Sequence, residues 1–182
     1  MTDVNFKNQP DRISSSNEKA RLDGPAEQLD ELPYDLIELL FFAYRDFTSD
    51  PDDVLAQYEF GRAHHRVLHF VDRNPGIKVT DLLNILRITK QSLGRVLKQL
   101  VDQDFIEQRP GPLDRRQRLL FTTGKGHDLA VRLSRLQTKR LEHATKDLPD
   151  GAADAVRQFL FQMIDPDARP DVAKLVRLSS QP

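Results

Sequence analysis

The chain has 182 residues, of which 38% are hydrophobic and 30% charged, and its formal net charge is −1 at pH 7. This length suits one domain with a sizeable core, and no run of about 18 apolar residues is present that could cross a bilayer. Cysteine is absent, which excludes disulfides, thiolate zinc sites and thiol redox switches. Because the polar N-terminus also lacks the apolar stretch of a secretory signal, we expect a cytoplasmic protein without a membrane segment or a cofactor.

The charge is divided unevenly along the chain. Residues 1–60 hold 5 Lys and Arg against 14 Asp and Glu, a net charge of −9, whereas residues 61–182 hold 22 against 14, a net charge of +8. A basic downstream part indicates a polyanionic partner, although a charge run is more often a solvated face. The charge division alone leaves both explanations open.

The first third of the chain predicts a tail followed by helices. Residues 1–30 lack sustained periodicity, so we expect a flexible N-terminal tail there. Apolar residues at helical spacing then predict a helix from Pro33 to about Phe47. The stretch "TSDPDD" predicts a break, with Pro51 in the first turns of a second helix that ends at "NPG" (residues 74–76).

Two short helices and a tight turn are predicted next. Residues 77–79 read as a short extended stretch, and Thr80 is the expected N-cap of a helix that ends near Arg87. Thr89 is the expected cap of a second helix, from Lys90 to about Asp102. This arrangement is typical of a helix-turn-helix.

The second helix has an apolar face and a face rich in amides and cations. Leu93, Val96, Leu97 and Leu100 recur at helical spacing and predict the buried side. The candidate DNA-binding residues of this helix and its cap are Thr89, Lys90, Gln91, Ser92, Arg95 and Lys98. A helix fits the major groove of B-DNA, where Gln pairs with adenine and Arg with guanine. An ordinary solvent-exposed face explains the same pattern equally well from this helix alone.

A cationic hairpin is predicted directly after that helix. Residues 105–109 and 118–122 read as strands, joined by "PGPLDRR" with Arg115 and Arg116 near the tip. Between residues 87 and 118 there are 8 cations and 4 carboxylates, a balance of +4. An Arg-bearing tip suits the negative potential of a narrow minor groove. We expect Asp114 to accept a hydrogen bond from the Arg116 guanidinium and hold it in one pose, with a plain solvated turn pair as the alternative.

Three stretches carry a resemblance to a known family. "DRRQRLLFTTGKG" (residues 114–126), "ITKQSLGRVLKQLV" and "RAHHRVLHFV" resemble the MarR-type winged-helix transcription regulators, and within them a PetP-like proteobacterial branch. The resemblance covers roughly residues 36–164. It implies that residues 90–102 lie in the major groove of double-stranded DNA, while Arg116 enters the minor groove with Asp114 as its buttress.

The resemblance also implies a fold. It is mainly α with a small β wing: a winged helix-turn-helix DNA-binding lobe (about 54–122) plus N- and C-terminal dimerisation helices (about 33–47 and 124–164). The winged-helix domain is expected to span residues 31–164, and residues 165–182 to form a C-terminal tail with a short helix near residues 172–178.

The C-terminal part supplies apolar helices that need a partner. Thr122 or Thr123 is the expected cap of a long helix that ends near Lys146, and a further helix is expected over residues 152–164. The resemblance implies that such helices interlock in a homodimer. Two dyad-related recognition helices would read a pseudo-palindromic operator with half-sites about 10 bp apart.

The histidines are the main candidates for other chemistry. His65 and His69 have the i, i+4 spacing of metal ligands, but without an H-E-x-x-H arrangement we expect packing or polar contacts and no metal. Family members often bind a small-molecule effector, and the resemblance places Tyr44, His64 and His65 near such a pocket. No catalytic motif occurs, so an enzyme is not expected. The alternative function is a winged helix that contacts an acidic protein partner instead of DNA.

Overall fold

The computed structural model describes residues 33–176. The predicted flexible tail over residues 1–30 lies outside the described residues. The chain divides into two units, residues 1–38 and 39–182, and the first contributes only residues 33–38, at the start of the first helix, to the described structure.

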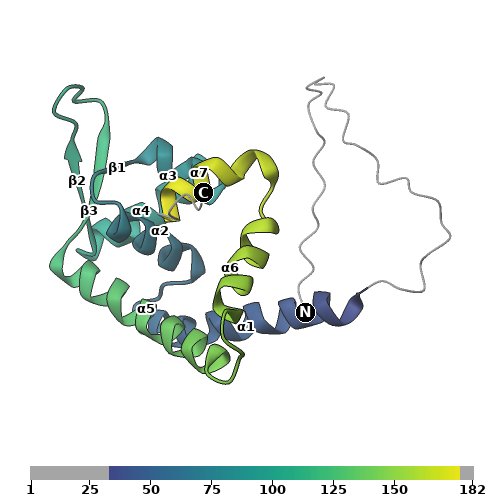
Figure 1. Cartoon of the computed structure of the whole chain (residues 1–182). Coiled ribbons are helices and arrows are strands. Elements are labelled where there is room, and N and C mark those ends of the chain that lie inside the picture. Colours follow the sequence, from purple (N-terminus) through teal and green to yellow (C-terminus); the bar gives the residue numbers. More distant parts are fainter. Residues whose placement is uncertain (1–32, 177–182) are drawn as a thin grey trace, which may run out of the picture. The chain divides into compact units, whose positions relative to one another are not determined.

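The predicted mainly helical fold with a small β wing is confirmed (Figure 1). The elements in chain order are α1 (Tyr34–Ala56), α2 (Arg62–Arg73), β1 (Ile77–Lys78), α3 (Val79–Leu86), α4 (Lys90–Asp102), β2 (Ile106–Pro110), β3 (Arg118–Thr122), α5 (Gly124–Thr145), α6 (Ala152–Gln162), the 3-10 helix η2 (Pro166–Ala168) and α7 (Arg169–Val176). The strands form an antiparallel sheet in the order β1-β3-β2. In Figure 1 the β2–β3 hairpin extends as a wing away from α3 and α4.

One continuous core joins the helix-turn-helix to the wing. Its fully buried members come from α1, α2, α3, α4, β2, β3 and α5, and include Leu55, Leu68, Leu82, Leu100, Ile106, Leu120 and Leu133. The apolar face predicted for α4 lies in this core. Burying an aliphatic side chain of this size contributes about 1.5–3 kcal/mol, so the core is what holds α4 and the wing against the rest of the lobe.

The predicted break before Pro51 was wrong, because α1 continues through that residue to Ala56. Proline removes one helical N–H and costs about 3 kcal/mol in a helix interior. Pro51 is fully buried, however, and Leu55, one turn further on, is fully buried as well. The Thr48 hydroxyl donates to the carbonyl of Tyr44 at 3.0 Å. Burial of Pro51 and of the turn that follows it therefore outweighs the cost of a proline inside the helix.

The break lies instead at residues 57–61, where the sequence offers little warning. Glu59 adopts a left-handed conformation with φ 58°. The Phe60 N–H donates to the carbonyl of Leu55 at 3.0 Å, which closes the end of α1 as a Schellman motif does. Glycine is the usual residue at such a position, so a glutamate there hides the helix end from sequence reading.

The predicted caps were right at two helices and wrong at one. The Thr89 hydroxyl oxygen accepts from the Ser92 N–H at 3.1 Å, and the Thr123 oxygen accepts from the Gly126 N–H at 3.0 Å. Thr80 is not a cap, because α3 begins at Val79 and the Thr80 hydroxyl donates to the Asp81 carboxylate at 3.3 Å. The short extended stretch pairs with β3, and α3 starts two residues earlier than a cap at Thr80 would set it.

Candidate nucleic-acid interface

The cap and the buried face of α4 together decide which side chains reach solvent. Thr89 binds the first turn through its cap, and its hydroxyl also lies 2.9 Å from the Ser92 hydroxyl oxygen. The apolar face of α4 is buried. The predicted recognition residues Lys90, Gln91 and Arg95 are consequently exposed on the opposite side.

The charges on this surface fall into two groups. Lys98 forms an ion pair with Asp102, and Arg109 pairs with Glu107 and lies over the Phe121 ring, with its guanidinium carbon 4.5 Å from the ring centroid. Within residues 33–176, the side chains of Lys90, Gln91, Arg95, Arg115 and Arg116 have no hydrogen bond or ion pair with the protein. These five side chains of α4 and the wing tip therefore have no partner within the described residues.

The wing tip is a loop that two backbone hydrogen bonds close. The Gly111 N–H donates to the Gln117 carbonyl at 3.0 Å, and the Gln117 N–H donates to the Asp114 carbonyl at 3.0 Å. A Cβ at Gly111 would lie 2.7 Å from the Asp114 carbonyl oxygen. Only glycine therefore allows this close approach, and the loop holds Arg115 and Arg116 outward at its tip.

The expected role of Asp114 needs a correction. Its Oδ1 accepts from the backbone N–H of Arg116 at 2.9 Å, not from the guanidinium. An aspartate readily bonds the amide two residues ahead, because the short side chain reaches it without strain. Asp114 thus supports the loop that carries Arg116 and leaves the guanidinium unbound.

His64 connects α2 to α4, a contact that sequence reading did not predict. Its Nδ1 accepts from the Gly61 N–H at 3.1 Å, so the proton resides on Nε2, which donates to Oε1 of Gln99 at 2.6 Å. The buried ring also stacks on Phe60, with centroids 4.6 Å apart. Both ring nitrogens are used inside the protein, and His64 positions α4.

The predicted effector residues are not gathered into one polar cluster in the described part of the chain. Tyr44 is exposed on α1, with the guanidinium carbon of Arg62 5.8 Å from its ring centroid. His65 is buried, and this burial, followed by the nearby His69, lowers its pKa. The side chain of His64 is engaged by Gln99. The three residues thus have different surroundings.

A second cluster ties α2, β3 and α5 together. The Asp72 carboxylate oxygen Oδ1 accepts from the Thr122 hydroxyl at 3.0 Å and from Nδ1 of His127 at 2.9 Å. The hydrogen bond to Asp72, and then its negative charge, raise the pKa of His127. This cluster fixes the base of the wing to the first turns of α5.

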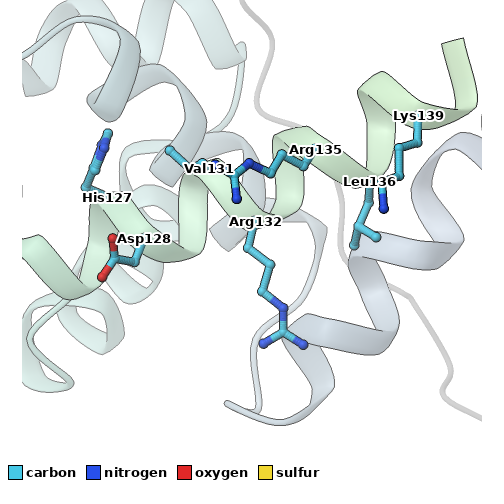
Figure 2. Close-up of a pocket in the computed structure, with 7 residues that line it drawn as sticks. All are labelled: His127, Asp128, Val131, Arg132, Arg135, Leu136 and Lys139. Atoms are coloured by element: carbon cyan, nitrogen blue, oxygen red, sulfur yellow. The ribbon is translucent and has the colours of Figure 1, made fainter. Parts of the chain in front are cut away.

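A cationic groove of about 510 Å³ lies along α5 and was missed by sequence reading. Figure 2 shows its lining residues along one helix: His127, Asp128, Val131, Arg132, Arg135, Leu136 and Lys139. The spacing of its cations could have predicted it. Arg132, Arg135 and Lys139 recur at i, i+3 and i+7, which places them on one helical face. Three cations and one carboxylate line the groove, besides His127.

Metal-binding clusters and membrane-spanning helices are both absent from the described residues. Between residues 33 and 176 no group of three or more His, Cys, Asp or Glu side chains is arranged to hold a metal ion. His65 and His69 both have pKa values lowered chiefly by burial. No helix in this same range has the length and apolar character needed to span a membrane.

Known proteins share both sequence and fold with this chain. A family model described as the MarR family matches residues 58–117. Over 133 residues the chain is 47% identical to the HTH-type transcriptional regulator PetP of Rhodobacter capsulatus, which covers 73% of this chain and 80% of that protein.

Solved structures give the same fold. Streptococcus pneumoniae FabT in complex with DNA is similar with a TM-score of 0.64 at 15% identity, covering 71% of this chain and 93% of that one. A putative MarR family regulator from Listeria monocytogenes, complexed with a 26mer DNA, is similar with a TM-score of 0.63 at 18% identity, covering 80% and 97%. At such identities the likeness concerns the fold.

Proposed function

The chain belongs to the MarR family of transcription regulators and to its PetP-like branch, and from this premise we propose that it reads operator DNA as a homodimer. As a member of this family it is a transcription regulator and not an enzyme. The observation that carries the proposal is the set of unpartnered polar side chains on α4 and at the wing tip. Two similar structures contain DNA by their descriptions, which supports the same use of this fold.

Direct base reading is assigned to the outer face of α4. Gln91 is suited to the two hydrogen-bonding positions of adenine, and Arg95 to O6 and N7 of guanine in the major groove. Each such pair discriminates against a wrong base by about 1–3 kcal/mol. His64 supports this role, because its bond to Gln99 holds α4 against α2.

Backbone contacts are assigned to the residues around these two. Thr89, Lys90 and Ser92 at the start of α4 are placed to meet phosphates, which fix the register of the protein on the duplex. Lys98 contributes less, since it must first leave Asp102. Arg115 and Arg116 enter the adjacent minor groove, where negative potential attracts arginine.

The homodimer is supported by apolar surface that the described chain leaves exposed. On α1 the exposed apolar residues are Tyr34, Leu36, Ile37, Leu39, Leu40, Phe41, Phe42 and Tyr44, and α6 contributes Val156, Phe159 and Leu160. Exposed apolar surface gathered on one element marks a protein interaction site more often than singly scattered residues do. We assign residues 54–122 approximately to the DNA-binding lobe and α1, α5 and α6 to dimerisation, which gives half-sites about 10 bp apart.

A small-molecule effector is the regulatory part of the proposal. Of the three residues predicted for its pocket, His65 keeps side-chain groups that no described hydrogen bond uses, whereas Tyr44 interacts with Arg62 and His64 is committed to Gln99 and Gly61. The cationic groove on α5 favours an anionic compound. An operator-binding protein of this kind acts in the cytoplasm, where bacterial DNA lies.

Binding to duplexes selected from a random pool, measured at several salt concentrations, tests the proposal. We expect affinity to fall steeply with salt, because each neutralised phosphate releases counterions. Lys90→Ala should weaken binding to all sequences and reduce the salt slope by about 1, whereas Arg95→Ala should cost about 1–3 kcal/mol and relax specificity at one base pair.

Lys98→Ala is the matched control for Lys90→Ala, because it removes a cation from the same helix that is already paired within the protein. Its effect should be the smaller of the two. If no salt-dependent duplex binding is found, the proposal fails, and a winged helix that contacts an acidic protein becomes the better explanation.

A further inference from the structure

Leu113 is an exposed apolar side chain in the loop at the tip of the wing. It is fully exposed to solvent, and it lies between Pro112 and Asp114 in the loop that joins β2 to β3. Single exposed apolar residues are common on protein surfaces. This one differs in its place, because it shares a tip with Arg115 and Arg116, which have no internal side-chain partner in the described chain.

The loop presents Leu113 in a defined way. The backbone bonds from Gly111 to Gln117 and from Gln117 to Asp114 close the loop on both sides of it. Asp114 is held in turn by the N–H of Arg116, and Pro112 restricts the backbone immediately before Leu113. Because the loop is closed by its backbone, the exposed Leu113 side chain contributes nothing visible to the fold of the wing.

A DNA minor groove could supply a contact surface both for the Leu113 side chain and for the arginines beside it. The groove is about 6 Å wide, and apolar side chains that enter it can lodge between base steps and partly unstack them. Pyrimidine–purine steps yield most easily to such insertion. An arginine beside an apolar side chain can therefore read both the potential of a minor groove and its deformability.

We propose that Leu113 is a minor-groove wedge that enters beside Arg116 and makes the protein favour operators with a flexible TA or CA/TG step at the wing position. The inference rests on the proposed DNA binding and deepens it. It adds a preference at base pairs that α4 does not read, and it acts through the shape of the duplex. Arg116 supplies attraction to the groove, and Leu113 supplies the selection of the step.

The test compares Leu113→Gln with Leu113→Met on a duplex selected from a random pool by the wild-type protein. A second duplex carries an AA step in place of the pyrimidine–purine step at the wing position. Leu113→Gln should bind the first duplex about fivefold more weakly than wild type, which corresponds to partial loss of one buried leucine. It should bind the second duplex as wild type does, and Leu113→Met should keep the wild-type preference.

A fluorescent base analogue, 2-aminopurine placed in the flexible step, gives an independent readout. Its fluorescence should rise when wild type or Leu113→Met binds, because the base loses stacking, and should stay low with Leu113→Gln. Equal affinity of wild type and Leu113→Gln for both duplexes would overturn the inference.

The Arg116→Ala variant separates the two levels of the proposal. If Arg116→Ala weakens binding while Leu113→Gln changes nothing, the wedge is wrong and the proposed DNA binding stands. If wild type shows no salt-dependent duplex binding, both are overturned.

Discussion

Helices α4 and α6 carry the same kind of apolar stripe, but the stripe is buried in α4 and exposed in α6. In α4 the stripe of Leu93, Val96, Leu97 and Leu100 is buried. In α6 no residue is buried, and Phe159, Leu160 and Met163 beside its end are 54%, 50% and 52% exposed. The amphipathic pattern alone therefore does not reveal whether the apolar face of a helix is buried within its own chain.

The difference shows which apolar faces are buried within the described chain and which stay exposed. The apolar side of α4 is buried against α2, β2 and the rest of the core. Its polar side therefore faces solvent. On α6 it is the apolar side that stays exposed. We expect DNA to cover the first of these exposed faces and a second copy of the chain to cover the other.

The largest effect on stability should come from a substitution in the buried apolar face of α4. Leu100→Ala removes a fully buried side chain from α4, so the free energy of unfolding should fall by about 2–5 kcal/mol. Denaturant unfolding measures it, and the loss should not depend on protein concentration. Leu160→Ala is the matched control, and its effect should appear only as a change in the concentration dependence of melting. A concentration-independent loss of the same size at Leu160 would contradict the comparison.

The next largest effect, on self-association, should come from a substitution in the exposed apolar face of α6. Phe159→Glu places a charge in the stripe of α6, and it should weaken self-association by about 1.5–3 kcal/mol or more, because a buried phenylalanine is lost. Light scattering after size-exclusion chromatography measures the mass. Gln158→Glu adds the same charge at the preceding exposed position and should remain dimeric. A monomeric wild type would show that α6 does not mediate self-association.

A smaller effect separates two roles of Asp114 in the wing. Asp114→Asn keeps an oxygen for the Arg116 N–H, so DNA affinity should stay near wild type or rise slightly as a negative charge is removed. Asp114→Ala loses the acceptor and should weaken binding by about 0.5–1.5 kcal/mol. Fluorescence anisotropy with a selected duplex measures both. If Asn weakens binding as much as Ala does, the carboxylate charge acts on the guanidinium after all.

The smallest effect concerns the cluster at the base of the wing. Because Asp72 raises the pKa of His127, this bond stabilises the fold fully below the unfolded pKa of about 6.5 and is lost as pH rises through the higher folded value. The melting temperature of wild type should exceed that of His127→Ala in acid, with the gap closing in alkali. A gap that widens with rising pH would mean that the bond does not involve the protonated ring.

Several parts of the fold were readable from local sequence. Thr89 was predicted as one cap and Thr122 or Thr123 as another, and Thr89 and Thr123 are caps, because an N-cap hydroxyl bonds a backbone amide only three residues ahead. The two wing strands and the buried face of α4 were predicted as well. The exposure of Gln91 and Arg95 follows from the same helical periodicity, and that of Arg116 from its place in the loop between the wing strands.

Other parts were decided by contacts between residues far apart in the chain. Pro51 stays inside α1 because the core buries it, and the turn after the end of α1 at Ala56 uses Glu59, a left-handed residue that is not glycine. The bond from His64 to Gln99 joins residues 35 positions apart.

By itself, the sequence determined which helices and strands form and which of their faces are apolar, because caps and periodicity act within one or two turns. Only the tertiary structure decided which apolar faces are covered, where α1 ends and which polar atoms bind one another. These outcomes depend on burial and on contacts that no short stretch of sequence contains.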